Sequence, residues 1–494
     1  MLDPIVIGAN ANGAPQYLFP SMANRHGLIA GATGTGKTVT LQILAEQFSK
    51  LGVPVFAADV KGDLSGMAQM GKMNKVIEKR TALIGIEDYQ LRGYPVRFWD
   101  IEGKNGHAVR TTVRDMGPDL LTNLLDLTDA QQGVLHVLFN YAEKEKLALL
   151  DFEDLESTLQ WLGQNRKAIS AEYGGMSTQS INAIQRKLLM LKSQKADQFF
   201  GEPALKLEDF MQCDSAGRGY INLLDARKVM LEPRVYTTFL LWFLTELFEQ
   251  LDEQGDADKP RLVFFFDEAH LLFDDANSAL LDRFEQVVRL IRSKGVGIYF
   301  VTQSPSDIPD SVLGQLGNRV QHALRAYTPK EQKAIRAAAQ AFRENPAFDT
   351  KEKITQLGLG EALVSCLDEK GVPSIVEHTI IRPPESRMGP VDEPLRQQLI
   401  ATSDLQAYYS ESLDRQSAEE VLLERVEKKR IQAELAEQKL AEQEAKEKEE
   451  KEQAKARAKK AKESKASLWN AVGRQVKSQL IRRIVTRVIR ALIR

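Results

Sequence analysis

A short stretch near the N-terminus has the residue types and spacing of a phosphate-binding loop. Gly31–Thr38 fits the pattern G-x-x-x-x-G-K-[ST], in which glycines let backbone N–H groups face a phosphate. Lys37 would reach the β- and γ-phosphates of a nucleotide, and Thr38 would ligate Mg²⁺. The predicted nucleotide-binding positions in the loop are Gly31, Thr33, Gly34, Thr35, Gly36, Lys37 and Thr38.

The residues on either side place this loop between a strand and a helix. Residues 27–30 form an apolar run typical of a buried strand, and residues 39–48 carry apolar side chains at helical spacing. The positive end of the helix dipole would strengthen the attraction for a phosphate. A glycine-rich turn with an exposed lysine is the alternative, and this context disfavours it.

Two adjacent acids follow an apolar run that is typical of a strand buried on both faces of a parallel sheet. Residues 262–266 are all apolar, and Asp267 and Glu268 come directly after them. We expect Asp267 to hold the Mg²⁺ shell and Glu268 to polarise the water that attacks the γ-phosphate. Gln303 ends the next apolar run and is predicted to sense that phosphate. The alternatives are two helix-capping acids and a loop glutamine.

The order of apolar runs predicts an α/β fold with a mostly parallel sheet. Strand-like runs at 53–59, 95–99 and 219–224 accompany those already described, and a hairpin is predicted over 362–380. A helical block without a catalytic constellation interrupts them. The predicted organisation is a discontinuous ATPase core (1–115 and 217–400), an all-α insertion (116–216), a long charged helical spacer (401–467) and a basic amphipathic helix (468–494).

Bulk composition excludes several classes of protein. The chain has 494 residues with 43% hydrophobic residues and a net charge of −2, which is typical of a globular protein. Two cysteines give no disulfide framework and no zinc spacing, which predicts a reducing, cytoplasmic location. We find no signal peptide, and no apolar run approaches the ~18–20 residues that span a bilayer.

The last segment combines an apolar face with positive charge. From Leu468 to Arg494, apolar residues recur every four positions, and seven Lys or Arg residues occur without any acid. Such a helix needs a cover for its apolar face, which an anionic membrane surface, a sister helix or the protein's own core would provide. Its basic side would also suit nucleic-acid phosphates. A solvated helix is favoured over a coiled coil for the preceding spacer.

The motifs, in this order, resemble the HerA/FtsK branch of P-loop motor ATPases. Residues 1–385 look like the HerA-like helicase proteins, and the charged tail is similar to that of YjgR-type bacterial members. The motifs that carry the resemblance are Asn24–His26, Gly31–Thr38, Asp59, Asp267–His270, Arg292–Gly295 and Gln303–Pro305. The resemblance implies a RecA-like P-loop ATPase core that uses ATP and Mg²⁺ and translocates or remodels duplex DNA as a hexameric ring.

The resemblance also implies roles for residues outside the loop. Asp59 corresponds to a family acid near the nucleotide. Arg25 falls where the family places an arginine finger that reaches a neighbouring subunit, and Arg292 where it places an arginine acting within its own subunit. Arg319 and Arg325 are rival candidates because both lie near predicted strand ends, and a surface charge is the alternative for Arg25 and Arg292.

One departure from the family concerns assembly and partners. Archaeal HerA carries an N-terminal barrel that contributes to ring assembly and to docking of a partner nuclease, whereas here only 30 residues precede Gly31. A partner nuclease is therefore doubtful. The competing hypothesis is a nucleotide-gated scaffold ATPase that contacts the inner face of the membrane peripherally through residues 468–494.

Overall fold

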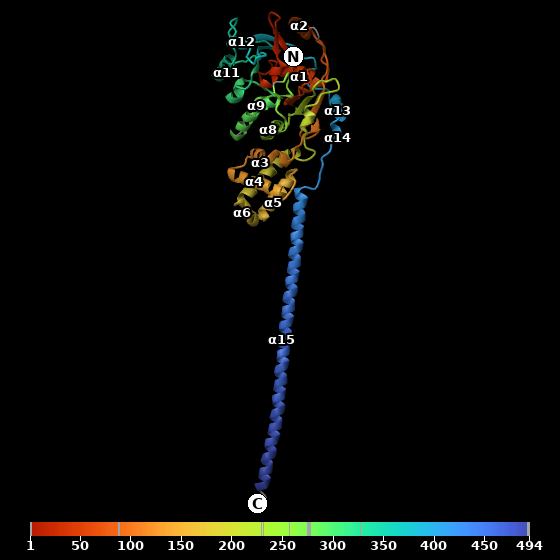
Figure 1. The fold of residues 1–494 in the computed structure, drawn as a ribbon, viewed down its shortest axis with the longest axis vertical. Coiled ribbons are helices and arrows are strands. Elements are labelled where there is room, and N and C mark those ends of the chain that lie inside the picture. The colour runs from red at the N-terminus through yellow and green to blue at the C-terminus, as the bar shows by residue number, and fades with distance from the viewer. Residues whose placement is uncertain are drawn as a thin grey trace. The chain divides into compact units, whose positions relative to one another are not determined.

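A computed structural model describes residues 2–86, 89–228, 230, 232–255, 257–273, 278–326 and 328–491. The chain divides into two compact units, Met1–Glu419 and Glu420–Arg494. The first contains a large sheet with helices around it (Figure 1), and the second is helical.

The first unit is built on one twelve-stranded sheet. Its strands are β1 (Ile5–Asn10), β2 (Pro15–Leu18), β3 (Gly27–Ala30), β4 (Val55–Asp59), β5 (Val96–Asp100), β6 (His107–Ala108), β7 (Ile221–Asp225), β8 (Leu262–Phe266), β9 (Val296–Thr302), β10 (Asn318–His322), β11 (Glu361–Ser365) and β12 (Glu377–Ile381). They lie in the order β2-β1-β12-β11-β10-β3-β9-β8-β4-β7-β5-β6. Neighbouring strands from β10 to β6 are parallel, and β2, β1, β12 and β11 extend the sheet antiparallel, so the predicted mostly parallel sheet is confirmed.

Helices cover the central strands on both faces. Successive side chains of a strand point to opposite faces of the sheet, so each face presents its own set of side chains to a helix. Phe265 of β8 lies 6.4 Å, centroid to centroid, from Phe48 of helix α1 (Lys37–Lys50). Its neighbour Phe264 lies 5.3 Å from Phe243 of α8 (Pro233–Gln250) on the other face. Both faces of β8 are therefore buried, as its all-apolar sequence predicts.

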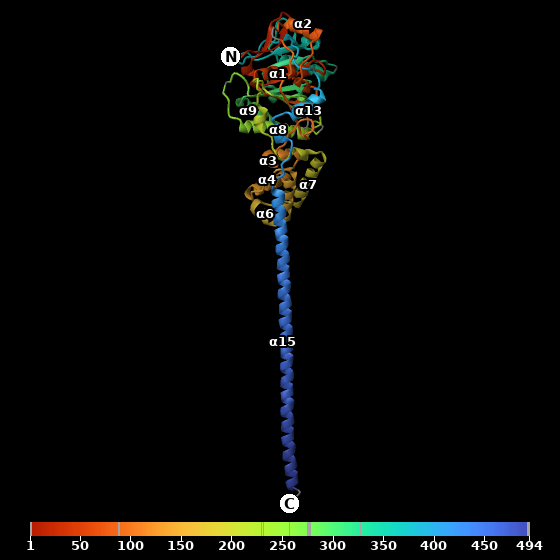
Figure 2. The same cartoon turned by 90° about the vertical axis from the view of Figure 1, so that its right-hand side faces the viewer.

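The predicted helical block is present. It comprises α3 (Val113–Leu124), α4 (Asp129–Lys144), α5 (Phe152–Gln164), α6 (Arg166–Tyr173) and α7 (Thr178–Ser193). Thr128 and Gln131 form the capping box that starts α4. These helices gather at one side of the sheet (Figures 1 and 2), and α3 packs on α8 of the core. The block thus belongs to the same compact unit as the sheet.

The folded unit continues beyond residue 400, where composition alone predicted its end. Helices α13 (Glu393–Ala401) and α14 (Gln406–Tyr409) follow the sheet. Tyr409 is buried, its ring lies 5.2 Å from that of Trp99, and its hydroxyl donates to Asp209 at 2.7 Å. The predicted start of the solvated spacer at residue 401 is therefore too early, because the compact unit runs to Glu419 and buries Leu405, Tyr409 and Ala418.

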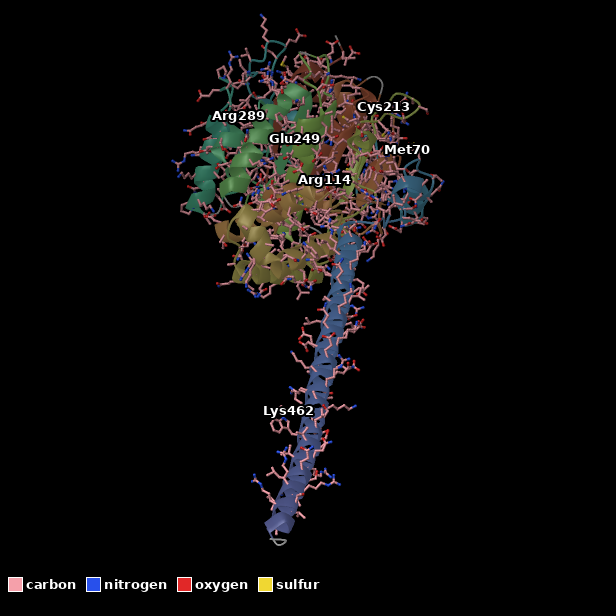
Figure 3. The ribbon with its side chains drawn as sticks, turned by 60° about the horizontal axis from the view of Figure 1, so that its bottom comes forward. Met70, Arg114, Cys213, Glu249, Arg289 and Lys462 are labelled. Atoms are coloured by element: carbon pink, nitrogen blue, oxygen red, sulfur yellow. The ribbon has the colours of Figure 1, made fainter. Side chains whose placement is uncertain are left out.

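The remaining helices complete the first unit. They are α2 (Lys75–Ile84), α9 (Ser278–Ile291), α10 (Asp310–Leu313), α11 (Pro329–Gln340) and α12 (Thr350–Gln356). Both cysteines are free: Cys366 is buried, and Cys213 lies at the surface, where Figure 3 labels it.

The second unit belongs to one long helix, α15 (Ala418–Ala491). Every side chain from Val426 to Val488 is exposed, as Figure 3 illustrates around Lys462. Surface pairs four residues apart, such as Arg430 with Glu434 at 2.6 Å, support the helix. Residues 492–494 of the predicted amphipathic helix lie outside the described residues. Among the described helices, none has the length and apolar character to cross a membrane.

A buried histidine before β3 makes stability depend on pH. His26 Nε2 lies 2.8 Å from the Val288 carbonyl oxygen, and Nδ1 accepts the Ile298 N–H at 3.0 Å. The neutral ring satisfies both contacts, whereas a protonated ring has no acceptor for Ile298. Burial lowers the pKa of His26 to about 4, and the charge of Arg292 adds to this.

We predict that the free energy of unfolding falls as pH decreases from about 6.5 to about 4. Unfolded His26 takes up a proton in this window and folded His26 does not, which costs up to about 1.4 kcal/mol per pH unit. Urea denaturation across this range should show a shallower decline for His26→Gln. His136→Gln, at a half-buried histidine, is the matched control, and equal slopes for the parent and His26→Gln would contradict the prediction.

Candidate active site

The glycine-rich loop joins the end of β3 to the start of α1. Gly34 and Gly36 have φ values of 76° and 120°, in the left-handed region that favours glycine. At Gly31 the constraint is space, because an added Cβ would lie 2.5 Å from the His322 Cβ. The motif residues therefore shape a tight turn that ends on a helix N-terminus, and Thr38 lies half-buried in the first turn of α1.

Lys37 bends back over this turn. Its Nζ donates to the carbonyl oxygens of Gly31 at 2.6 Å and Ala32 at 3.2 Å. Burial lowers the pKa of the ammonium, while the charges of Glu268 and Asp267 act in the opposite direction. The amine is thus held at the mouth of the loop, where an incoming phosphate would offer it stronger acceptors.

Asp267 is a buried carboxylate with an unused oxygen. Its Oδ1 accepts the Glu268 N–H at 3.0 Å, and within the described residues no donor reaches Oδ2. Burial, reinforced by the charge of Glu268, raises the pKa of Asp267 to about 6. An uncompensated buried oxygen fits a cation better than a structural cap, since buried polar atoms are otherwise hydrogen-bonded.

These residues fit a magnesium ion shared with a nucleotide. The described residues contain no cluster of three or more His, Cys, Asp or Glu side chains that would hold a metal alone. Mg²⁺ usually takes one or two protein oxygens and completes its octahedron with water and phosphates. Asp267 and the Thr38 hydroxyl would supply that protein share.

Glu268 follows Asp267 and is contacted by side chains that lie at neighbouring strand ends. Its Oε1 lies 2.5 Å from the Lys61 Nζ, and its Oε2 accepts the amide of Gln303 at 3.3 Å and lies 3.4 Å from Nδ1 of His270. The Lys61 ammonium and these contacts hold the pKa of Glu268 below its usual range despite the opposing effect of burial. Glu268 is therefore a carboxylate, and so able to accept a proton.

Asp59 ends β4 next to this pair. The register that aligns Ala58 with Phe266 brings Asp59 beside Asp267. Burial, together with the charge of Asp63, raises the pKa of Asp59 to about 7. Its Oδ1 accepts the Gly62 N–H at 2.8 Å. Asp59 thus shapes the loop that carries Lys61.

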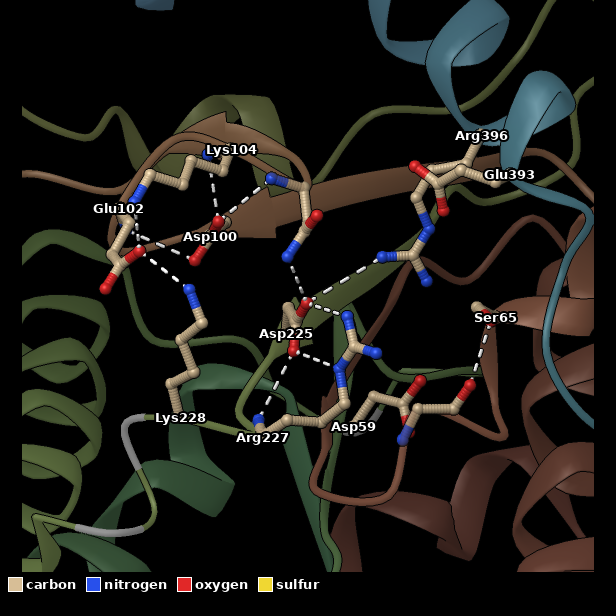
Figure 4. A network of polar contacts seen from close by, with 12 residues as sticks. Asp59, Ser65, Asp100, Glu102, Lys104, Asp225, Arg227, Lys228, Glu393 and Arg396 are labelled. Carbon is tan, nitrogen blue, oxygen red and sulfur yellow. Dashed lines mark hydrogen bonds and ion pairs between the residues drawn. The ribbon is translucent and has the colours of Figure 1, made fainter.

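The row of acids continues along the same sheet edge (Figure 4). Asp225 and Asp100 end β7 and β5, in register with Asp59. Asp225 is paired with Arg227 at 2.5 Å and more distantly with Arg396 at 3.8 Å. Away from the candidate site, then, Asp225 is paired with arginines, and Asp100 accepts the backbone N–H groups of Lys104 and Asn105.

The structure does not bring Arg25 and Arg292 to the loop of their own chain. Arg25 precedes β3, and Arg292 lies in the turn (Arg292–Lys294) that precedes β9. Because β3 and β9 are parallel, both arginines lie at the opposite edge of the sheet from Lys37. The within-subunit role expected for Arg292 is therefore not consistent with this placement.

The rival arginines differ from each other. Arg319 starts β10 at the far edge and donates to the carbonyls of Leu316 and Leu313. Arg325 lies beyond the other end of β10 and lines a cleft of about 600 Å³, together with Thr33 and Gln303. Of the four candidate arginines, Arg325 alone lies beside the loop.

Sequence reasoning missed two residues of the site. Lys61 bonds Glu268, and the only signal for it was its place two residues after Asp59, on a loop at a strand end. His322 lies beneath the loop, with Nε2 2.8 Å from the Thr40 hydroxyl and Nδ1 2.9 Å from the Glu361 carbonyl oxygen. No sequence motif marks this histidine.

This fold and loop define a P-loop nucleotide-binding protein of the RecA-like class. The chain belongs to the family described as Helicase HerA-like C-terminal, whose profile matches residues 5–494.

Curated relatives share the family at low identity. The chain is 20% identical over 353 residues to the DNA double-strand break repair helicase HerA of Saccharolobus solfataricus, covering 69% of this chain and 61% of the relative. It is 22% identical over 382 residues to a probable helicase, MJ1565, of Methanocaldococcus jannaschii, covering 72% and 62%. The chain thus spans about three fifths of the length of these relatives.

Solved structures with similar folds are more distant. The plasmid coupling protein TrwB in complex with ADP and Mg²⁺ matches with a TM-score of 0.46 and 16% identity, covering 77% of this chain and 91% of that one. VirB4 of Thermoanaerobacter pseudethanolicus matches with a TM-score of 0.48 and 14% identity, covering 76% and 96%.

We predict that Asp267→Asn stabilises the nucleotide-free protein while removing Mg²⁺-dependent nucleotide binding. The raised pKa means that ionised Asp267 lowers stability as pH rises through about 6, a loss that asparagine avoids. The gain should reach about 1–3 kcal/mol at pH 8 and shrink at pH 5. Thermal unfolding at both pH values measures it, with exposed Asp252→Asn as control. A destabilised variant at pH 8 would contradict the prediction.

Proposed function

We propose that this protein is an ATP-hydrolysing motor that acts on duplex DNA as a ring of identical subunits. The observation that supports hydrolysis is the meeting of three groups at one sheet edge: the buried Lys37 amine, the Asp267 carboxylate with its free oxygen, and the Glu268 carboxylate. This arrangement supports phosphoryl transfer to water as the reaction.

The chain's own residues would act as follows. Backbone N–H groups of the loop and the start of α1 cradle the β- and γ-phosphates, and Lys37 exchanges the loop carbonyls for phosphate oxygens. Thr38 and Asp267 hold Mg²⁺, which neutralises phosphate charge when bound. Glu268 accepts a proton from water as the water oxygen bonds to the γ-phosphorus. The bond from that phosphorus to the bridging oxygen breaks, and its electron pair leaves with ADP.

A ring would bring a further arginine, from a neighbouring subunit, to this site. Arg25 and Arg292 lie at the edge of the sheet opposite the loop. In a closed ring built by head-to-tail contacts, an arginine at this edge would complete the neighbour's site if the edge faced the loop of the next copy. A hexamer is the ring size that the family resemblance implies.

Duplex DNA is the proposed polymer because of the family. Relatives that match this chain are named DNA double-strand break repair helicases. Because the chain spans about three fifths of their length, we carry over the polymer class and no particular pathway.

We predict that duplex DNA raises the rate of ATP hydrolysis and that Glu268→Gln abolishes turnover while sparing ATP binding. Removing a general base costs about 10²–10⁴-fold, whereas glutamine keeps the size of the side chain. Phosphate release with and without DNA, beside fluorescent-nucleotide binding, measures both effects.

Single-stranded DNA and RNA of equal length serve as controls for the polymer. Hydrolysis that is equal with every polymer and with none would contradict the DNA motor while leaving the ATPase. Light scattering tests the ring, since a monomer that is insensitive to ATP would contradict it. Retained turnover in Lys37→Ala would contradict the site itself.

A second function, a scaffold ATPase at a membrane surface, is favoured by one feature of α15. Residues 468–488 expose an apolar row that includes Leu480 and Ile484, each more than half exposed. Arg482, Arg483 and Arg487 lie in the same stretch, and residues 468–494 contain no acid. A basic amphipathic helix of this kind suits the headgroup region of an anionic bilayer.

We predict that the full-length protein floats with liposomes that contain anionic lipid and that deletion of residues 468–494 abolishes this. Liposomes of neutral lipid alone should bind less because they lack the electrostatic part of the attraction. Flotation that the deletion leaves unchanged would rule out this role of the helix.

A further inference from the structure

Glu268 forms an ion pair with a residue 207 positions earlier in the chain. The Lys61 Nζ lies 2.5 Å from Oε1 of Glu268, and the glutamate side chain is only 8% exposed. The other carboxylate oxygen is bonded by Gln303. Loops that follow three adjacent strands, β4, β8 and β9, thus meet at one carboxylate.

The backbone conformation of Glu268 explains why its side chain needs such partners. Its φ and ψ are 48° and 51°, in the left-handed region, which is unfavourable for a residue with a Cβ. This conformation turns the chain sharply after β8 and sets the direction of the side chain. A carboxylate that leaves a strained turn needs partners that hold it, because strain persists only where surrounding contacts impose it.

Hydrogen bonds fix the loop that carries Lys61. Gly62 has a φ of 80°, and its N–H donates to Asp59. The Ser65 hydroxyl donates to the Gly62 carbonyl oxygen at 3.0 Å. These bonds close a tight turn directly after β4, so the Cα of Lys61 is positioned and its long side chain is left to span the distance to Glu268.

We propose that Lys61 is a positioning residue for hydrolysis, which holds the Glu268 carboxylate where it can take a proton from the attacking water. The proposal rests on the function proposed above. Lys61 also places a second cation near Lys37, within the subunit, where Arg292 was expected and is not found. A general base must first lie within reach of the proton it accepts, and this ion pair determines that reach.

The test compares steady-state ATP hydrolysis and nucleotide binding of the full-length parent, Lys61→Met and Lys61→Arg. Lys61→Met should lower kcat by about 10²-fold, the lower end of what a displaced general base costs, and leave KM for ATP within about threefold. Lys61→Arg keeps the charge and should recover much of kcat. Lys104→Met and Lys228→Met are matched controls, because both lysines pair with Glu102 at the same sheet edge and do not contact Glu268.

A second measurement does not depend on turnover. Thermal unfolding of the nucleotide-free parent, Lys61→Met, Glu268→Gln and the double variant gives a double-mutant cycle. Lys61→Met should lower the midpoint clearly in the parent background, where it leaves a buried carboxylate unpaired, and much less beside Glu268→Gln.

The outcomes separate the two proposals. A parent without any ATP hydrolysis overturns the proposed function. An active parent whose kcat is unchanged in Lys61→Met, or an additive cycle, overturns the role of Lys61 alone. The role of Lys61 would also be overturned if Lys104→Met and Lys228→Met lowered kcat as much. The effect would then come from losing any positive charge at this sheet edge.

Discussion

The structure depends on keeping negative charge where water is scarce. Parallel strands present their carboxyl ends at one edge, and four adjacent strands end on or directly before an aspartate there: Asp267, Asp59, Asp225 and Asp100. Burial opposes ionisation, so each acid needs a positive partner or N–H donors. Asp225 has arginines and Asp100 has backbone N–H groups. Asp267 keeps one oxygen without a donor, and this exception marks the site.

Much of this arrangement could be predicted from local sequence. The P-loop and the all-apolar β8 were predictable because each is a continuous stretch whose neighbours dictate its conformation, and Asp267 must follow β8 at the sheet edge. The helical block was predictable from capping residues such as Thr128. Local patterns suffice where the strand, the turn and the functional residue are consecutive in the chain.

What the sequence could not reveal depends on distant contacts. The pair of Lys61 with Glu268 joins residues 207 positions apart, and the burial of Tyr409 depends on Trp99 and Asp209. Composition placed the end of the core at residue 400 because it cannot register a few buried side chains, such as Leu405 and Tyr409, in a polar segment. The within-subunit role of Arg292 came from the family resemblance alone, and the structure places Arg292 before β9, at the edge opposite the loop.

The two free thiols differ in a way that has practical value. Cys366 is fully enclosed, and burial raises the pKa of its thiol to about 12, whereas Cys213 lies on the surface. Thiolates, not thiols, react with maleimides, so at mildly alkaline pH alkylation would be confined to Cys213. The native chain therefore offers one attachment point for a fluorophore or spin label on its sheet-containing unit, without any engineered substitution.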